Sequence, residues 1–195
     1  MKKIVITGGL GYIGTELCKI YSGYSWNDHI TVIDNRFISE RVNQIRNWNM
    51  NFVQGDILDK ELIKKYCEEA DIVHHLAGIT DVPRVKSESN QEHDLKIKMV
   101  AEEGTQNILD AISDKCKIVM PSSHVIYEGM EKVKNDIKEN EKTSPVLSYG
   151  KSKDFNEKQL KASGKNYIIL RLGSVYGYST DTARIDIMAN FFSKM

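Results

Sequence analysis

The chain has 195 residues, which is enough for one domain with a substantial buried core. Its 27 basic and 27 acidic side chains cancel, so the net charge argues against a nucleic acid or an anionic membrane as the main partner. No run approaches the roughly 20 apolar residues of a membrane helix. We therefore expect a cytoplasmic protein whose partners are small molecules.

Short apolar runs alternate with helix-like stretches along the chain. The runs that predict strands are 3–7, 30–34, 51–54, 72–77, 117–121 and 167–172. The stretches that predict helices are 11–21, 40–47, 60–68, 91–112 and 149–162. This alternation predicts an α/β fold, namely a Rossmann-type doubly wound parallel sheet in a three-layer α/β/α arrangement.

The helix expected at 91–112 has the strongest apolar periodicity. Its apolar positions are Leu95, Met99, Ile108, Leu109 and Ile112, which we expect to pack on the sheet. The stretch 130–145 is rich in Lys, Glu and Asn, and it predicts a solvated excursion before the last helix.

The cysteine and histidine residues do not form a disulfide or metal pattern. The three cysteines, Cys18, Cys67 and Cys116, are widely spaced in apolar segments, which favours buried, reduced thiols. His74 and His75 are neighbours on a predicted strand. Their rings should point to opposite faces, so they cannot bind one ion together.

A glycine-rich turn, TGGLGYIG at 7–14, follows the first predicted strand and opens the first helix. Gly8, Gly11 and Gly14 would permit the tight turn and a close approach of the backbone to a pyrophosphate, which the helix N-terminus also attracts. Tyr12 and Ile13 complete the motif. Glycine spacing by itself also fits a turn that binds nothing, so a second feature is needed to favour a dinucleotide.

That second feature is Asp34, which ends the second predicted strand, with Asn35 directly after it. A carboxylate here can accept hydrogen bonds from adenosine ribose hydroxyls and repel a 2′-phosphate, which favours NAD over NADP. Arg36 leaves an alternative open, because an arginine can hold a 2′-phosphate; otherwise it is a solvated surface charge.

These motifs resemble the extended short-chain dehydrogenase/reductase family, which includes UDP-galactose 4-epimerase-like enzymes. The resemblance implies that Asp56 and Ile57, after the third strand, contact adenine. It also implies that Leu76, Ala77 and Gly78, after the fourth, lie against the cofactor ribose, although the family commonly has alanine where Gly78 stands. Without the resemblance, Asp56 could equally cap the helix that follows.

A tyrosine and a lysine stand four residues apart at the start of the last predicted helix, as Tyr149 and Lys153. Four residues bring both side chains to one helix face. A nearby Lys⁺ and a positive nicotinamide ring would stabilise a phenolate, so Tyr149 could take a proton from a sugar hydroxyl as hydride leaves for NAD⁺. Lys153 would also bridge the nicotinamide ribose hydroxyls.

The stretch PSSHVIYEG, 121–129, resembles the family's Ser-Ser-X-X-Val-Tyr-Gly segment. The resemblance assigns Ser123 as the catalytic hydroxyl that orients the reacting oxygen; without the Tyr and Lys, a helix cap or turn would explain both serines. His124 and Val125 stand where the related 4,6-dehydratases have Asp-Glu, which argues against dehydration. His124 is either a second acid or base or a packing residue.

Two further positions bear on the resemblance. The stretch LRLGSVYG, 170–177, resembles the family's turn beside the nicotinamide, in which Arg171 could simply be a structural ion-pair residue. Ala101 stands where the family commonly has an Asn, three residues before Gly104-Thr105.

The sequence thus predicts an NAD-binding Rossmann domain at 1–172 and, at 173–195, the start of an incomplete substrate-binding region. The first hypothesis for function is an NAD-dependent nucleotide-sugar epimerase or a close relative, acting by transient hydride transfer. A sugar dehydrogenase or ketone reductase would use the same three catalytic residues, and a non-catalytic NAD-binding module is the third alternative. The resemblance also implies a homodimer formed through the helices at 91–112 and 149–162.

Overall fold

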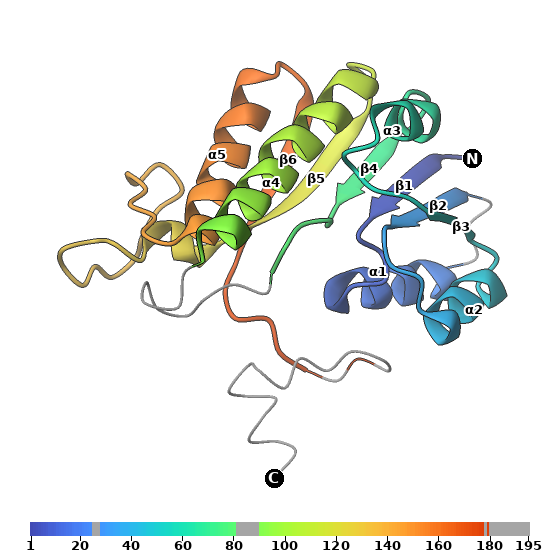
Figure 1. Ribbon diagram of the computed structural model, residues 1–195, viewed down its shortest axis with the longest axis horizontal. Coiled ribbons are helices and arrows are strands. Elements are labelled where there is room, and N and C mark those ends of the chain that lie inside the picture. The colour runs from blue at the N-terminus through green and yellow to red at the C-terminus, as the bar shows by residue number, and fades with distance from the viewer. Residues whose placement is uncertain (25–27, 81–89, 178, 180–195) are drawn as a thin grey trace, which may run out of the picture.

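The computed structural model describes residues 1–24, 28–80, 90–177 and 179 (Figure 1). In this part of the chain six strands form one sheet in the order β3-β2-β1-β4-β5-β6, and every neighbouring pair is parallel. The strands are β1 (Lys3–Thr7), β2 (His29–Asp34), β3 (Asn51–Gln54), β4 (Ile72–His75), β5 (Lys117–Ser123) and β6 (Asn166–Leu172). The predicted doubly wound parallel sheet is confirmed.

Helices cover both faces of this sheet, which gives the three predicted layers. They are α1 (Tyr12–Gly23), α2 (Ser39–Asn47), α3 (Lys60–Cys67), α4 (Gln91–Ala111) and α5 (Ser148–Ala162), with a short 3₁₀ helix, η2 (His124–Tyr127), after β5. Figure 1 shows α1 and α2 on one side of the strands and α3, α4 and α5 on the other. The stretch 130–145 contains neither helix nor strand, as predicted.

Two buried clusters hold the layers together, one on each face. Successive strand residues point to opposite faces, so Ile4 and Ile6 pack with α1 and α2, whereas Val5 packs with α3, α4 and α5. Each fully buried aliphatic side chain of this kind contributes roughly 1.5–3 kcal/mol relative to leaving it exposed. Apolar strands that are covered on both faces therefore account for the parallel sheet around β1, whereas the edge strand β6 leaves Ile168 41% and Leu170 45% exposed.

The strand order predicts where on the sheet a ligand binds. The chain first builds outward from β1 to β2 and β3, and then returns to place β4, β5 and β6 on the other side of β1. In sheets of this type, ligands bind in the crevice outside the carboxyl ends of the strands, at the point where the strand order reverses. Here that point lies between β1 and β4.

Two apolar side chains of α4 do not pack as predicted. Leu95 and Met99 are 60% and 41% exposed, whereas Ile97 and Ile108 are buried. A helix turns about 100° per residue, so Leu95 and Met99 lie on the side opposite Ile97 and Ile108. Part of the apolar surface of α4 is therefore turned away from the sheet.

No helix in the described ranges is long and apolar enough to cross a membrane. The expected start of a substrate-binding region at 173–195 lies mostly outside the described residues, which include 173–177 and 179 of it.

Candidate functional site

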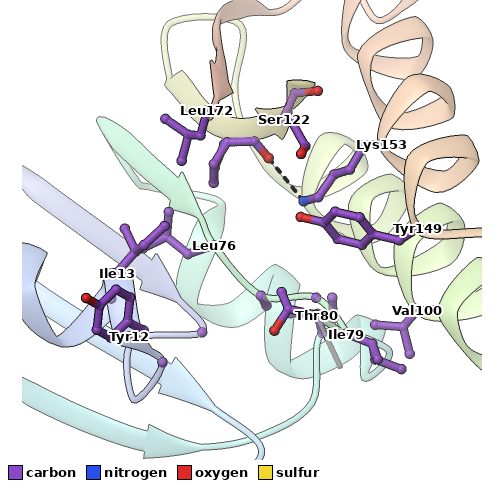
Figure 2. A pocket seen from close by; sticks show the side chains of 18 of the residues that line it. Tyr12, Ile13, Leu76, Ile79, Thr80, Val100, Ser122, Tyr149, Lys153 and Leu172 are labelled. Carbon is purple, nitrogen blue, oxygen red and sulfur yellow. Dashed lines mark hydrogen bonds between the residues drawn. The ribbon is translucent and has the colours of Figure 1, made fainter. Parts of the chain in front are cut away.

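A cleft of about 1210 Å³ opens at the carboxyl ends of the strands. Every residue that the sequence predicted for cofactor binding or catalysis lines it, namely Gly8, Gly11, Tyr12, Ile13, Gly14, Asp34, Asn35, Asp56, Ile57, Leu76, Ala77, Gly78, Ser123, Tyr149 and Lys153. Figure 2 shows Tyr149 and Lys153 reaching into the cleft from α5, across from Tyr12, Ile13 and Leu76. The fold thus gathers residues from distant parts of the sequence at one site.

The glycine-rich turn depends on its glycines for close packing. Gly8 has a φ of +70°, and a Cβ atom there would lie 2.6 Å from the backbone nitrogen of Ala77. A Cβ atom on Gly14 would lie 2.4 Å from the Gly8 carbonyl oxygen. Gly11 is the N-cap residue of α1, where no side chain caps the helix. The turn and the uncapped helix start are the features that a pyrophosphate group requires.

The carboxylate of Asp34 holds this turn. It is buried, and its Oδ2 accepts a hydrogen bond of 3.0 Å from the backbone N–H of Leu10. Its Oδ1 accepts from the backbone N–H of Arg36 at 3.0 Å and from Arg36 Nε at 3.3 Å. Arg36 is therefore an ion-pair partner of Asp34, although its side chain is half exposed.

Arg41 is a site residue that the sequence analysis missed. It projects from α2, is buried, lines the cleft and donates a hydrogen bond to the carbonyl oxygen of Leu10. Asp34 and Arg41 thus bind the backbone N–H and the carbonyl oxygen, respectively, of the same loop residue, Leu10. Nothing in the local sequence signals this, because the contact spans 31 positions.

Asp56 and Asn35 meet at the adenine end predicted for the cleft. Asn35 Nδ2 donates to Asp56 Oδ2 at 3.1 Å, and Asp56 Oδ1 accepts from the backbone N–H of Leu58. The alternative that Asp56 caps the following helix is wrong, because the N-cap of α3 is Asp59, which accepts from the Leu62 N–H. Asp56 instead orders the turn between β3 and α3.

Gly78 departs from the family's alanine without a steric requirement. A Cβ atom added there would meet no atom within 4 Å. The departure therefore leaves the cleft wall intact.

His75 links the glycine-rich turn to α4. Its Nδ1 lies 3.0 Å from Thr7 Oγ1 and its Nε2 lies 3.0 Å from Thr105 Oγ1. Burial, with a smaller effect of the nearby Lys153 charge, lowers the pKa of His75 to about 3. Its ring is therefore neutral near pH 7. The adjacent His74 contacts Tyr21 instead, so the two rings diverge as predicted.

Lys153 is partly buried at the inner end of the cleft. Its Nζ donates a hydrogen bond of 3.0 Å to the Pro121 carbonyl oxygen (Figure 2) and lies 5.7 Å from the centroid of the Tyr149 ring. Burial lowers the pKa of Lys153 to about 8. A cation held this close to a phenol ring stabilises any negative charge that develops on the phenol oxygen.

Ser123 ends β5 and caps η2, where its Oγ accepts a hydrogen bond from the Val125 N–H at 3.4 Å. Ser123 thus makes the capping contact that the sequence offered as an alternative, and it also lines the cleft. His124 is exposed, and its Nδ1 lies 3.2 Å from the Leu172 carbonyl oxygen, a partner that suits the packing interpretation.

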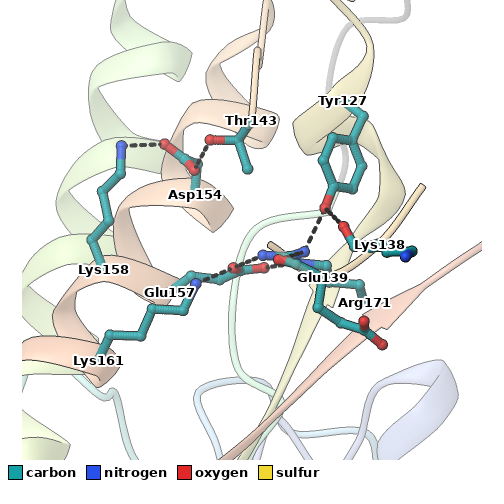
Figure 3. A network of polar contacts seen from close by, with 9 residues as sticks. All are labelled: Tyr127, Lys138, Glu139, Thr143, Asp154, Glu157, Lys158, Lys161 and Arg171. Carbon is teal, nitrogen blue, oxygen red and sulfur yellow. Dashed lines mark hydrogen bonds and ion pairs between the residues drawn. The ribbon is translucent and has the colours of Figure 1, made fainter. Parts of the chain in front are cut away.

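Arg171 forms the ion pair that the sequence suggested for it. Its guanidinium binds both carboxylate oxygens of Glu157, and it also donates to the Tyr127 hydroxyl and to the Glu139 carbonyl oxygen (Figure 3). The buried Ser122 hydroxyl lies against Glu157, although its geometry falls short of a full hydrogen bond.

Ala101 stands where the family commonly has an Asn, and its backbone carbonyl oxygen is hydrogen-bonded. Asn156, which is buried on α5, donates from Nδ2 to the Ala101 carbonyl oxygen at 2.9 Å. This contact ties α4 to the helix that carries Lys153.

All three cysteines are free and buried. Burial raises the pKa of Cys18 and Cys67 to about 12 and that of Cys116 to about 11, so the thiols are not ionised near pH 7. The described residues also contain no cluster of His, Cys, Asp and Glu that could hold a metal ion.

The chain is similar to curated epimerases and dehydratases. It is 32% identical to a UDP-glucose 4-epimerase of Neisseria meningitidis serogroup C over 174 residues, which is 82% of this chain and 48% of that protein. It is 29% identical to a dTDP-D-glucose 4,6-dehydratase of Dictyostelium discoideum over 198 residues, or 91% of this chain and 44% of that protein. The chain thus spans about half the length of the curated relatives it matches.

Solved structures share the fold. A UDP-glucose 4-epimerase from Brucella ovis in complex with NAD matches with a TM-score of 0.72 and 28% identity, covering 95% of this chain and 55% of the other. A UDP-N-acetylglucosamine 4-epimerase from Methanobrevibacter ruminantium, in complex with UDP-N-acetylmuramic acid, matches with a TM-score of 0.72 and 25% identity, covering 94% and 60%. The model of the NAD dependent epimerase/dehydratase family matches residues 4–195. The chain therefore belongs to the NAD dependent epimerase/dehydratase family.

Proposed function

We propose that this chain is the NAD-binding part of a nucleotide-sugar epimerase or a close relative, which oxidises a sugar hydroxyl transiently. The observation that carries the proposal is the partly buried Lys153 ammonium, 5.7 Å from the centroid of the Tyr149 ring, in the cleft that the glycine-rich turn also lines. Relatives named as UDP-glucose 4-epimerases support the choice of reaction.

The residues of the cleft fit NAD. The uncapped start of α1 and the close-packed turn suit a pyrophosphate, and the Asp34 carboxylate suits the adenosine ribose. Asp56 and Ile57 would lie along adenine, and Leu76, Ala77 and Gly78 along the second ribose. When bound, NAD⁺ would supply the hydride acceptor.

Three side chains would handle the proton of the sugar hydroxyl. Tyr149 accepts it, and the Lys153 charge stabilises the phenolate that would otherwise form only at high pH. Ser123 hydrogen-bonds the reacting oxygen and fixes its direction. Return of hydride to the opposite face of the transient ketone would complete an epimerisation. His124 and Val125, in place of an Asp-Glu pair, favour this outcome over loss of water.

We also propose that residues beyond the Rossmann domain at 1–172 complete the sugar site, and that the protein forms a homodimer. Both α4 and α5 leave large apolar side chains exposed outside the cleft, with Leu95 at 60% and Phe155 at 39%. A second copy would remove this surface from water. Sedimentation of the wild-type chain and of a Leu95→Glu variant tests the dimer: the variant should be monomeric.

Calorimetric titration with NAD⁺ and NADP⁺ tests the cofactor assignment. We expect NAD⁺ to bind more tightly than NADP⁺, and Asp34→Ala to weaken NAD⁺ binding and reduce the preference. Binding of neither cofactor, or an Asp34→Ala variant that behaves as wild type, would contradict the assignment.

Turnover of UDP-sugars then tests the reaction. The Tyr149→Phe variant should keep NAD⁺ and lose activity. Retention of NAD through many turnovers distinguishes an epimerase from a dehydrogenase, which must release its reduced cofactor. An active Tyr149→Phe variant would overturn the proposed role of the phenol.

A further inference from the structure

Helix α5 carries Tyr149 and Lys153, yet its own residues do not secure its start. The N-cap residue is Leu147, whose side chain cannot cap, and the first turn contains no acidic residue. A helix start normally has a capping oxygen or a nearby negative charge to satisfy its free N–H groups. Tyr149 is the second residue of this helix, so any fraying at its start would displace the phenol.

Glu128 supplies the missing acceptor and charge. Its Oε1 accepts hydrogen bonds from the backbone N–H groups of Val146 at 2.9 Å and Leu147 at 2.7 Å. A carboxylate at this end of a helix is stabilised by the helix dipole, and a charged acceptor makes the hydrogen bonds stronger than neutral ones. The start of α5 is thus held by a residue that lies 19 positions before Leu147.

Glu128 is itself tied to Ser123. It is the C-cap residue of η2, and its N–H bonds to the Val125 carbonyl oxygen, while Ser123 is the N-cap of the same turn. Both ends of this one short turn therefore face the catalytic centre: Ser123 at its start lines the cleft, and Glu128 at its end lines the cleft and holds α5.

The two segments fit together closely beyond the carboxylate. Ser144 donates its N–H to the Ile126 carbonyl oxygen at 2.7 Å, and Gly129 donates its N–H to the Ser144 carbonyl oxygen at 2.8 Å. Gly150 lets the backbone approach, because a Cβ atom there would lie 3.1 Å from the Val125 carbonyl oxygen. The contact is a defined interface, and Glu128 is its charged member.

We propose that Glu128 is a positioning residue, which fixes Tyr149 of α5 relative to Ser123 and Lys153 through its hydrogen bonds to Val146 and Leu147. The inference rests on the proposed function, since it assumes that Tyr149 and Ser123 act together. Glu128 stands where the Ser-Ser-X-X-Val-Tyr-Gly pattern has glycine, which cannot form these side-chain bonds. The hydrogen bonds from Val146 and Leu147 to Glu128 are therefore not implied by that family pattern.

Two neutral variants separate hydrogen bonding from charge. Glu128→Gln keeps an oxygen that can accept from both N–H groups, whereas Glu128→Ala keeps neither the oxygen nor the charge. If only the negative charge near Tyr149 mattered, the two variants would behave alike. Glu131→Ala, which removes an exposed acid three residues further along, is the matched control.

The first readout is the ionisation of the Tyr149 phenol, which does not require turnover. The rise of tyrosinate absorbance with pH is recorded for each NAD⁺-saturated variant, and the same curve for its Tyr149→Phe counterpart is subtracted. We expect Glu128→Ala to ionise about one pH unit above Glu128→Gln, because its phenol has moved away from the Lys153 charge. Coincident curves for the two variants would overturn the inference.

The second readout is turnover at saturating substrate. Glu128→Ala should lose activity by roughly tenfold to a hundredfold, the cost of a displacement of about 1 Å, while Glu128→Gln keeps most of it and NAD⁺ affinity stays the same. A Glu128→Ala variant as active as wild type would overturn the inference. An inactive wild type would count against the proposed function alone, because the phenol titration still decides the role of Glu128.

Discussion

Glu157 and Arg171 form a two-point ion pair in the interior, with Arg171 Nε 2.8 Å from Glu157 Oε1 and Nη2 2.6 Å from Oε2. The side chains are 2% and 16% exposed, respectively. Burial alone would raise the pKa of Glu157, but hydrogen bonds from Arg171 and Lys161, together with the adjacent Ser122 hydroxyl, outweigh it and lower that pKa to about 2. The pair ties α5, one turn beyond Lys153, to strand β6.

Glu157→Gln should therefore lower the free energy of unfolding by about 3 kcal/mol, because it leaves the buried guanidinium without its counter-charge. Urea unfolding at pH 7 measures this. Asp114→Asn is the control: it breaks the Lys165–Asp114 pair, in which the acid is 90% exposed and screened by water, and it should cost far less. Similar losses in both variants would contradict the importance of the buried pair.

The same pair predicts a pH dependence. The folded pKa of Glu157, about 2, lies below its ordinary value of 4.5. The stabilisation is therefore complete above about pH 4.5 and is lost as the pH falls towards 2. The difference between wild type and Glu157→Gln should shrink across this range. A difference that stays constant down to pH 2 would be inconsistent with a lowered pKa.

His75 predicts a second loss of stability in acid. Its folded pKa, about 3, lies below the ordinary value of 6.5, so between these values the unfolded chain binds a proton that the folded protein excludes. Stability should fall as the pH drops from 6.5 towards 3. Unfolding of a His75→Gln variant at pH 7 and pH 5 tests this: the variant is less stable at pH 7 but loses less between the two pH values than wild type.

We expect that replacing Lys153 removes activity but increases the stability of the fold. Burial lowers the pKa of Lys153 from 10.5 to about 8, so at pH 7 the folded protein holds a partly buried ammonium at a cost. Lys153→Met should abolish activity while raising the free energy of unfolding of the ligand-free chain by roughly 1 kcal/mol.

The sign of the pH effect provides a check on Lys153. Wild-type stability should rise between pH 8 and 10.5, where the folded amine is neutral and the unfolded one is still charged, so the advantage of Lys153→Met should shrink there. Lys158→Met, at a side chain that is 69% exposed, should change stability by less than about 0.5 kcal/mol. An unchanged or lower stability in Lys153→Met at pH 7 would mean that the partly buried charge carries no cost.

We expect Arg36 to influence how strongly Asp34 rejects a 2′-phosphate. The guanidinium partly neutralises Asp34 through the bond from its Nε, 3.3 Å long, and it lines the same cleft. Arg36→Ala should therefore increase the preference for NAD⁺ over NADP⁺ by about tenfold, or 1.4 kcal/mol, with little change for NAD⁺ itself. Calorimetry with both cofactors measures the ratio, and a reduced preference would contradict this expectation.

Elements with a strong local signal could be predicted from the sequence. The predicted strand 3–7 coincides with β1, because an apolar run buried on both faces has one stable solution. The predicted helix 60–68 ends within one residue of α3. The residues of the cleft could also be named, since the glycine-rich turn and the Tyr and Lys pair each follow a local pattern.

Contacts between distant segments could not be predicted. Helix α5 begins at Ser148 rather than at the predicted residue 149, and its start carries no local capping signal because Glu128 holds it from outside. β5 extends to Ser123, beyond the predicted end at 121, because β6 pairs with it as far as Leu172. The short helix η2 was expected only as the alternative in which a helix cap or turn explains Ser122 and Ser123.

The two hydrogen bonds to the backbone of Leu10 affect the entropy of ligand binding. Asp34 accepts from its N–H and Arg41 donates to its carbonyl, so the peptide groups on both sides of this loop residue are already oriented in the ligand-free chain. Ordering the backbone of one residue costs about 1–2 kcal/mol. Because this loop is already ordered in the folded chain, nucleotide binding does not incur that cost. We therefore expect the nucleotide to associate fast, without a delay for loop rearrangement.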